Sequence, residues 1–356
     1  MLTCFTAIGL TKCIRPPISR STILALEWAA LGAIGGAIGG ALGLAGLTTL
    51  RARRRERRYE ARFPPLGRVV TVEGKRLHLW QAGSGPDLVM IHGSSANLRE
   101  FTMGLAPALT DRFRVTLVDR PGLGWSDDAG DSPAAQARLI RLGCAAAGVT
   151  RPLVLGHSYG GAVALAWGLQ APVAGLVILS GVAMPWPGGL GPWYAATATA
   201  LGRALIVPLV TAFVPRRKIE ASIAEVFAPQ NSISGYAYGP DGQAKRIEDY
   251  AFAAAVPLIL RRKALATNAR QVNRLLQFVR EMAPQYHTIS APVEILHGDS
   301  DTIVPHHIHA LPLAERLPDA ALTLLPGVGH MPHQTHPAEV TAAVLRLAGR
   351  AGLALD

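Results

Sequence analysis

The stretch PLVLGHSYGGAVALAW, residues 152–167, contains the turn on which the fold depends. Its first apolar residues suit a strand that is buried on both faces, and the apolar run at its end is long enough for a helix. A tight strand-to-helix turn requires residues without bulk on both sides of its apex, and Gly156 and Gly160 meet this requirement. The turn places Ser158 at the start of the helix, where backbone N–H groups favour negative charge, so Ser158 is predicted to be a nucleophile.

The same apolar signature recurs along the chain on both sides of this stretch. Short apolar runs occur at residues 87–93, 114–119, 175–180, 292–298 and 321–327. Helix-length stretches lie between most of the runs, at 99–110, 133–148, 159–170 and 305–317. This alternation predicts an α/β fold, with a mostly parallel central sheet and helices on both of its faces. Residues 68–83 instead read as two strands that turn at Glu73 and Gly74.

A serine hydroxyl needs a base to remove its proton and a carboxylate to orient that base. Two segments after Ser158 begin where the chain leaves the carboxyl end of a predicted strand, the edge at which active sites gather in α/β sheets. HGDSDTIVP (297–305) offers Asp299 and Asp301, and GVGHMPHQTHP (327–337) offers His330, His333 and His336. His92 is a rival base, although it precedes the nucleophile and lies in the loop after another strand.

The oxygen that becomes negative when a serine attacks a carbonyl requires hydrogen-bond donors. The backbone N–H of Tyr159, directly after the nucleophile, is one predicted donor, and Ser94, in the loop after residues 87–93, is the other. We expect this chemistry to need no metal and no organic cofactor. The cysteines are Cys4, Cys13 and Cys144, which are too few and too scattered for a cysteine zinc site or a disulfide scaffold.

These segments together resemble the α/β-hydrolase superfamily over about residues 66–350. VDRPGLGWSD (118–127) is similar to the loop after the fourth strand in the haloalkane-dehalogenase, epoxide-hydrolase and lipase/esterase branch. The resemblance implies that Ser158 is the nucleophile, Asp301 the acid and His330 the base. Asp301 is preferred over Asp299 because the family pattern Gly-x-x-Asp precedes a hydrophobic-Pro pair, here Val304-Pro305. Dehalogenases and epoxide hydrolases have Asp as nucleophile, so serine favours ester hydrolysis.

Residues 182–287 interrupt the alternation of strands and helices. The resemblance implies a helical cap here, inserted after the sixth strand, between two parts of the hydrolase core at 66–181 and 288–356. The apolar run WYAATATALGRALIVPLVTAFVP (193–215) also has the length of a membrane span, but Arg203 and Pro208 lie near its middle. We therefore favour a cap, which would form the acyl or leaving-group pocket and exclude water.

An uncharged apolar segment lies near the N-terminus. Residues 28–50 carry no charge and are long enough to span a hydrocarbon core of about 30 Å. We interpret 1–21 as an N-terminal segment, 22–50 as a transmembrane anchor and 51–65 as a basic juxtamembrane linker. A glycine-rich linker and a cleaved signal peptide are the alternatives. Gly32, Gly36 and Gly40 form small-xxx-small steps, which predict self-association of the helix in lipid.

The positive charge of the chain is concentrated in one place. The formal net charge is +11, and RARRRERRYEAR (51–62) holds seven Arg and two Glu. A nucleic-acid-binding domain would instead interleave basic and aromatic residues over a surface, so we expect no nucleic-acid partner. The N-terminal flank of the apolar segment has fewer cations, Lys12, Arg15 and Arg20. The positive-inside tendency then predicts a single-pass protein whose catalytic domain is cytoplasmic.

The sequence thus predicts a membrane-anchored serine hydrolase that cleaves carboxylic esters of lipophilic acyl groups through Ser158, His330 and Asp301. The same residues could serve C–C bond hydrolysis, perhydrolysis or acyl transfer, and the sequence barely separates these reactions. A binding protein built on a hydrolase fold is a third interpretation, which the intact serine, acid and histidine disfavour.

Overall fold

The computed structural model describes residues 4–5, 12–13, 19–189, 191–230, 232–233 and 245–355. The chain divides into two compact units, residues 1–51 and residues 52–356. Most of the predicted N-terminal segment 1–21 lies outside the described residues. Its described part contains β1 (Cys4–Phe5) and β2 (Lys12–Cys13), which pair antiparallel, and the start of α1 (Arg20–Arg62).

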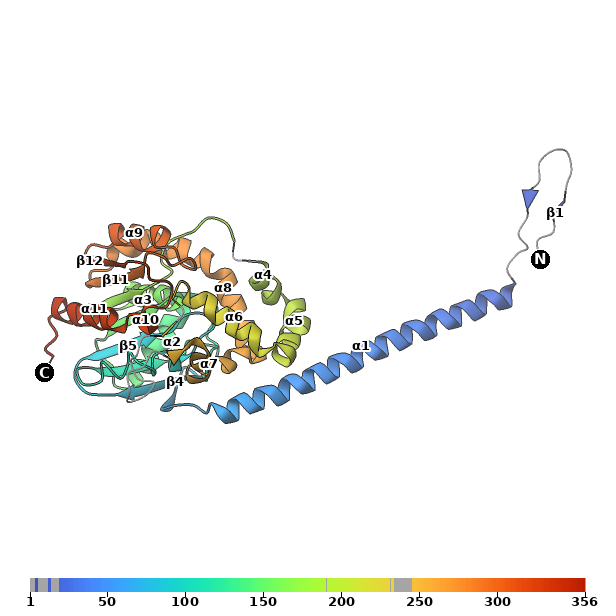
Figure 1. Cartoon of the computed structure of the whole chain (residues 1–356), viewed down its shortest axis with the longest axis horizontal. Helices are drawn as coiled ribbons and strands as arrows, with labels where there is room; N and C mark the ends of the chain where they lie inside the picture. Colours follow the sequence, from blue (N-terminus) through green and yellow to red (C-terminus); the bar gives the residue numbers. More distant parts are fainter. Residues whose placement is uncertain are drawn as a thin grey trace. The chain divides into compact units, whose positions relative to one another are not determined.

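The second unit is built around an eight-stranded sheet (Figure 1) with the order β12-β11-β8-β7-β5-β6-β4-β3. From β5 to β12 neighbouring strands are parallel, whereas β4 pairs antiparallel with both β3 and β6. Glu73 and Gly74 both have positive φ in the turn between β3 and β4, as the predicted hairpin requires. The strands are β3 (Arg68–Val72), β4 (Lys75–Ala82), β5 (Asp87–Ile91), β6 (Arg114–Val118), β7 (Leu153–His157), β8 (Gly175–Leu179), β11 (Val293–Gly298) and β12 (Ala320–Leu325).

Both faces of the sheet are buried, which explains why its central strands are continuously apolar. In β5, Val89 and Ile91 join the hydrophobic cluster that includes α2 and α3, whereas Leu88 and Met90 join the cluster on the other face with α11. The mostly parallel sheet with helices on both faces is therefore confirmed. The covering helices are α2 (Pro133–Ala146), α3 (Tyr159–Gln170), α9 (His306–Arg316), the short α10 (Pro332–Thr335) and α11 (Pro337–Arg350).

The helix expected at residues 99–110 does not form. Only η1 (Leu98–Glu100) is helical, and turns follow it up to residue 112. Gly104 and Pro107 explain the difference, because glycine weakens a helix and proline lacks the N–H that a helix interior needs. The segment nevertheless covers the sheet, since Phe101, Leu105 and Leu109 are buried in the core.

A helical region follows β8, the sixth strand of the main sheet, as predicted for a cap. Its apolar run 193–215 forms two helices that meet at an angle of 110°. Thr199 ends the first helix and caps the second through a hydrogen bond from the Gly202 N–H. The elements of the region are α4 (Pro192–Ala198), α5 (Ala200–Phe213), α6 (Arg216–Phe227), β9 (Ser232–Ile233), β10 (Lys245–Arg246), α7 (Ile247–Ala253), η2 (Val256–Leu260), α8 (Arg262–Met282) and η3 (Ala283–Thr288).

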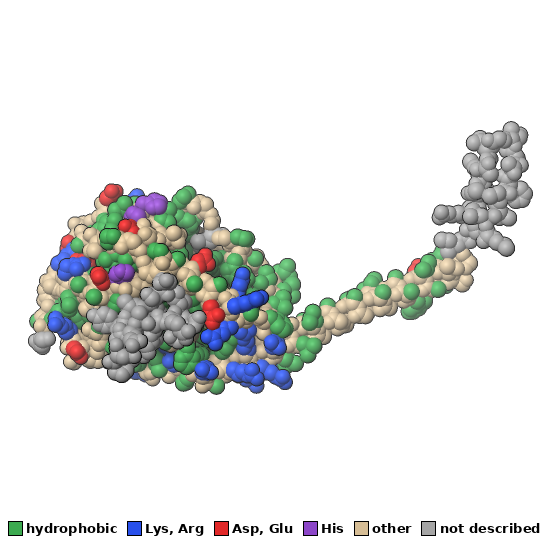
Figure 2. All heavy atoms as spheres, viewed as in Figure 1, with side chains coloured by type: hydrophobic (Ala, Val, Ile, Leu, Met, Phe, Trp, Pro, Cys, Tyr) green, Lys and Arg blue, Asp and Glu red, His purple; other side chains and the backbone are tan. Residues whose placement is uncertain are grey.

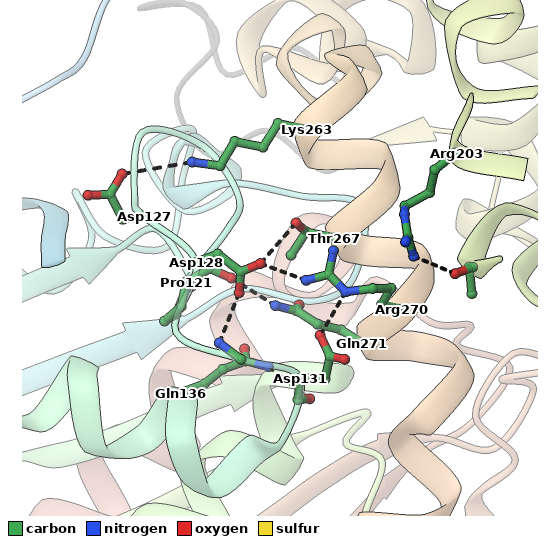
Figure 3. Close-up of polar contacts among 12 residues, drawn as sticks. Pro121, Asp127, Asp128, Asp131, Gln136, Arg203, Lys263, Thr267, Arg270 and Gln271 are labelled. Carbon is green, nitrogen blue, oxygen red and sulfur yellow. Dashed lines mark hydrogen bonds and ion pairs between the residues drawn. The ribbon is translucent and has the colours of Figure 1, made fainter. Parts of the chain in front are cut away.

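Helix α8 attaches this cap to the core through the loop between β6 and α2 (Figure 3). Arg270 contacts Asp128 at 2.6 Å and Asp131 at 3.3 Å. Gln271 donates a hydrogen bond of 2.9 Å to the carbonyl oxygen of Pro121. These contacts involve partly buried charges and a fully buried amide, so they hold the position of the cap more firmly than exposed ion pairs would.

Residues 51–62, most of the linker that we expected at 51–65, are the last turns of α1 in the structure. Glu56 and Glu60 are four residues apart and therefore share one helix face. Glu56 forms a two-pronged ion pair with Arg262, with distances of 2.9 and 2.8 Å, and Glu60 contacts Arg261 at 3.2 Å. The helix ends at Arg62, directly before the predicted breaker Phe63-Pro64-Pro65. The acidic face of α1 thus contacts the domain. These residues, which the charge run alone indicated as a linker, are helical and bound to it.

Among the described residues, α1 is the one unbroken helix that is long and apolar enough to cross a membrane. Its apolar part is exposed, and it lies near the N-terminus, where a signal sequence has the same properties. Helices α4 and α5 reach comparable length only across their bend.

The turn between β7 and α3 depends on two close backbone approaches. A Cβ added to Gly160 would lie 2.2 Å from the carbonyl oxygen of Ile91, and one added to Gly156 would lie 2.2 Å from that of Gly160. Side chains at these positions cannot be accommodated without moving β5 or α3. Ser158, at the apex, has φ of 54° and ψ of −119°, a conformation that is costly for a residue with a side chain.

We expect Gly160→Ala to destabilise the protein, because its methyl group meets backbone atoms rather than a flexible side chain. Overpacking of this kind costs about 1–3 kcal/mol and should lower the melting temperature by several degrees in a thermal scan of the full chain. Gly349→Ala in α11 is the matched control, since an added Cβ there has no neighbour within 4 Å. Equal melting temperatures for Gly160→Ala and wild type would contradict this account of the turn.

Candidate active site

Ser158 is held in place by its own backbone. Its N–H donates to the carbonyl oxygen of Leu179 at 3.0 Å, and its carbonyl oxygen accepts from the N–H groups of Gly161 and Val182, each at 3.0 Å. These bonds tie the apex of the turn to β8 and to the chain that leaves it. The strained backbone is thereby kept rigid, and the side chain keeps one direction.

The structure brings Ser158, His330 and Asp301 together in one chain of hydrogen bonds. His330 Nδ1 lies 2.7 Å from Asp301 Oδ2, and His330 Nε2 lies 3.0 Å from Ser158 Oγ. Because a carboxylate only accepts, the imidazole proton belongs on Nδ1, which leaves Nε2 to accept the serine proton. Asp301 Oδ1 accepts from the N–H groups of Ile303 and Val304, both at 2.9 Å, which fixes the carboxylate.

The electrostatics of these groups suit proton transfer at neutral pH. Burial alone would raise the pKa of Asp301, but hydrogen bonds from His297, His330 and the Val304 backbone hold the pKa of that carboxyl well below its usual range. Burial lowers the pKa of His330 in spite of the opposing effect of Asp301. At pH 7 the site therefore holds a carboxylate and a neutral imidazole, as a general base requires.

The other candidates from the sequence lie elsewhere. Asp299 is exposed and accepts a hydrogen bond of 2.7 Å from the N–H of Gly327. His92 accepts from the N–H of Arg120 at 2.9 Å and donates to the carbonyl of Gly93, so both of its ring nitrogens hold backbone groups. His336 contacts Thr335, its neighbour in the chain.

The two predicted oxyanion donors stand on either side of Ser158. Tyr159 follows it at the start of α3, and the loop of Ser94 passes so near that a Cβ on Gly93 would lie 3.1 Å from the Ser158 Cβ. Within the part of the chain that the structure describes, neither the Ser94 N–H nor the Tyr159 N–H has a hydrogen-bond partner. Two free N–H groups beside a serine can bind a negatively charged oxygen.

Arg120, whose role the sequence did not reveal, contacts the peptide group of one predicted donor and the side chain of the other. Its buried guanidinium donates to the Gly93 carbonyl oxygen at 3.2 and 3.4 Å and lies 4.0 Å from the centre of the Tyr159 ring. The Gly93 carbonyl and the Ser94 N–H belong to one planar peptide, so fixing the first orients the second. The one feature of the sequence that could have indicated this role is the position of Arg120 in the 118–127 loop, shortly after a buried strand.

A family model described as the alpha/beta hydrolase family matches residues 88–344, which is most of the chain and includes every residue of this constellation. The chain belongs to this family.

The proteins that are similar to this hydrolase have names that describe different activities. A pimeloyl-[acyl-carrier protein] methyl ester esterase of Nitrosomonas europaea is 29% identical over 73% of the chain and 95% of that protein. A protein named magnesium-chelatase 30 kDa subunit, from Rhodobacter capsulatus, is also 29% identical, over 70% of the chain and 82% of that protein. The esterase RhEst1 of a Rhodococcus species has a similar fold, with a TM-score of 0.59 and 21% identity over 79% of this chain and 97% of that chain.

Behind the hydrolase's serine lies a buried network that sequence reasoning also missed. Glu100 Oε1 lies 3.1 Å from His157 Nδ1 and 2.7 Å from His333 Nε2. His157 Nε2 lies 2.9 Å from the carbonyl oxygen of His330. Glu100 and the His330 carbonyl oxygen therefore favour the protonated form of the His157 ring. Although burial opposes this charge, Glu100 raises the pKa of His157. Burial lowers the pKa of His333 to about 4, so this ring is neutral.

The same three side chains are the one group among the described residues whose donor atoms lie close enough to share a metal ion. Glu100 Oε1 forms a hydrogen bond of 2.7 Å with His333 Nε2, and its 3.1 Å contact with His157 Nδ1 is an ion-pair distance. We therefore interpret Glu100, His157 and His333 as an ion-paired cluster that supports the loop of His330, rather than as ligands of a metal ion.

We expect Glu100→Gln to change the pH dependence of hydrolysis. Burial lowers the pKa of His330, Asp301 raises it, and the neighbouring His157 and His297 lower it. The ring centre of His157 lies 5.0 Å from that of His330. Loss of the Glu100 charge lowers the pKa of His157, so less positive charge stands beside His330 and the pKa of His330 rises. Because a protonated imidazole cannot accept the serine proton, the acidic limb of kcat/KM should move to higher pH, by about half a unit or more.

The matched control is Glu294→Gln, a buried carboxylate that pairs with Arg346 and Arg350 on another part of the sheet. Its pH profile should keep the wild-type acidic limb. An unshifted limb in Glu100→Gln, or the same shift in both variants, would contradict the assignment.

Proposed function

We propose that this α/β hydrolase is a membrane-anchored serine esterase that cleaves carboxylic esters of lipophilic acyl groups through an acyl-enzyme. The observation that carries the proposal is the continuous hydrogen-bonded chain from Asp301 through His330 to Ser158 Oγ. The nucleophile is serine rather than aspartate, which favours acyl transfer chemistry, and the similarity to a methyl ester esterase supports an ester substrate.

In this mechanism Ser158 Oγ attacks the ester carbonyl while His330 Nε2 takes the hydroxyl proton. The tetrahedral oxyanion accepts hydrogen bonds from the N–H groups of Ser94 and Tyr159. His330 returns its proton to the alkoxide, which leaves as an alcohol. Water then attacks the acyl-enzyme, again giving a proton to His330, and the acid leaves as Ser158 regains its hydrogen. Asp301 stabilises the imidazolium in both half-reactions.

The alternative reactions use the same residues, so kinetics must separate them from ester hydrolysis. With a p-nitrophenyl ester, an initial burst followed by turnover to the free acid identifies plain hydrolysis. Transfer of the acyl group to an added alcohol or to peroxide in preference to water identifies acyl transfer or perhydrolysis. A fluorophosphonate that fails to label folded protein at Ser158 would support a binding protein instead.

The proposed anchor is the apolar part of α1, with the catalytic domain on the cytoplasmic side. Its length and the Arg run that follows it directly support a span over a cleaved signal peptide. The glycines between residues 32 and 46 have open space where a Cβ would lie, which suits close packing of a second copy of this helix in lipid.

We expect Ser158→Ala and His330→Ala each to abolish ester turnover without changing the melting temperature greatly, because the two residues act as one unit. Turnover of p-nitrophenyl esters by the purified full chain is the measurement. Retention of more than about one part in a thousand of the activity by either variant would overturn the triad assignment.

The acid is tested by a matched pair of substitutions. Asp301→Asn should cost far more activity than Asp299→Asn, since Asp301 contacts His330 whereas Asp299 accepts from Gly327 in a turn. The reverse order would assign the acid to Asp299.

The membrane topology is tested with a reporter fused after Asp356. We expect β-galactosidase to be active and alkaline phosphatase to be inactive in this fusion, because seven Arg follow the apolar segment and fewer cations precede it. Active periplasmic alkaline phosphatase would refute the cytoplasmic placement. Release of the full domain into the soluble fraction by high salt alone would refute the span.

A further inference from the structure

Helix α5 carries an apolar stripe on its exposed face. Leu201, Leu205, Leu209 and Phe213 are spaced by four residues, and their exposed fractions are 69%, 53%, 48% and 49%. Residues at this spacing lie on one side of a helix. The opposite side of α5 is buried at Val207 and Thr211, and the small residues Gly202 and Ala212 are buried on the side of the stripe. A continuous row of large apolar side chains on a surface marks an interaction site.

Most of the charges around this stripe are positive, although Glu220 follows in α6. Residues 193–218 contain Arg203, Arg216, Arg217 and Lys218 and no acidic residue. All four cations are exposed; Arg203 donates to the carbonyl of Ala198, and Arg216 pairs with Glu220 in the next turn. Figure 2 shows that hydrophobic side chains and a cluster of Lys and Arg gather on the same side of the domain. An apolar helix face with flanking cations suits the surface of an anionic bilayer.

The Arg run adjoins the end of this helix. Arg55 donates to the carbonyl oxygens of Val214 at 2.8 Å and of Thr211 at 3.4 Å, at the C-terminal end of α5. The two acids of the run face α8, where Arg262 and Arg261 neutralise them. The exposed cations of this segment of α1 are Arg51, Arg53, Arg54, Arg57, Arg58 and Arg62. The run therefore presents its positive charge outward and extends the basic surface of the stripe.

Chain length places the stripe within reach of the proposed membrane anchor. The apolar segment ends at Leu50, and Arg55 follows five residues later. Even a fully extended chain would separate these positions by no more than about 18 Å. This limit holds for any orientation of the two units, so the C-terminal end of α5 stays near the interface into which the anchor inserts.

We propose that the exposed face of α5, with its flanking cations, is a second membrane contact that rests on the surface of an anionic bilayer and turns the cap toward the lipid. The inference rests on the proposed membrane anchoring and adds to it a specific lipid-binding surface. A second copy of the chain fits this surface less well, because two such faces would bring like charges together. Contact of the cap with lipid would let apolar esters reach Ser158 from the bilayer.

The test uses the full chain in vesicles, with the environment-sensitive fluorophore nitrobenzoxadiazole on Leu205→Cys. Cys4 and Cys13 are replaced by serine, whereas Cys144 is buried and needs no change. In vesicles that contain phosphatidylglycerol we expect a blue-shifted emission that brominated lipid quenches, and a smaller shift in pure phosphatidylcholine. The same label on Glu315→Cys, an exposed position in α9, should respond to neither lipid.

A second variant links the surface to catalysis. Leu205→Asp/Leu209→Asp should lower the rate on a long-chain ester carried in anionic vesicles by about tenfold and leave the rate on soluble p-nitrophenyl acetate unchanged. Equal losses on both substrates would indicate damage to the fold and overturn the proposed role of the stripe.

The outcomes separate this inference from the proposed function. Wild-type protein that leaves the vesicles in carbonate refutes the anchor. Protein that stays bound while the label at position 205 reports water in anionic vesicles refutes the second contact. A blue shift that depends on protein concentration and not on lipid charge assigns the face to a second copy of the chain. Absent ester turnover refutes the esterase proposal and leaves the fluorescence result intact.

Discussion

The close approach of Gly160 to the carbonyl oxygen of Ile91 is the contact on which the site depends. It lets α3 start immediately beside β5, so the apex of the β7–α3 turn, with Ser158, lies between the loops that leave β5 and β8. Parallel pairing of β5, β7, β8, β11 and β12 then brings the carboxyl ends of these strands to one edge. Ser94, Asp301 and His330 arrive at that edge from separate loops. A larger residue at position 160 would separate these loops.

Buried charges fix the loops that the sheet brings together. Asp119 contacts His78 Nδ1 at 2.6 Å and accepts from the N–H groups of Leu98 and Trp125, both at 2.8 Å, so it ties the loop after β6 to β4. Arg120 beside it holds Gly93, and burial lowers the pKa of its guanidinium to about 10 while leaving it charged at neutral pH. A buried charge is destabilising unless an opposite charge or a hydrogen bond compensates it. Loss of a partner of Asp119 or Arg120 would therefore leave a buried charge uncompensated.

The cap and the last turns of α1 meet at one element, the start of α8. Arg261 and Arg262 bind the acidic face of α1, and Arg270, two turns later, binds the loop after β6. The segment that leads to the apolar helix is thus joined to the helix that carries the cap. Arg55, which donates to the carbonyl oxygen of Val214 at the end of α5, adds another contact between α1 and the cap. This connection gives a physical reason for placing a long Arg-rich helix directly before a hydrolase domain.

The sequence by itself determined the local features. Apolar runs of strand length, helix-length stretches between them, the Glu73-Gly74 hairpin and the Gly-x-Ser-x-Gly turn follow from burial and backbone freedom within a few residues. From these, the α/β fold, the place of the cap and the residues Ser158, Asp301 and His330 could be predicted, although the choice of Asp301 over Asp299 needed the family pattern. Only the tertiary structure decided which distant groups meet. Glu100 and His333 are far apart in sequence, and the partners of Arg120 and Glu56 come from other elements. The same holds for the 99–110 segment and for residues 51–62, whose conformations depend on contacts with the domain. Such pairings arise from the strand order, and no short-range property of the chain encodes them.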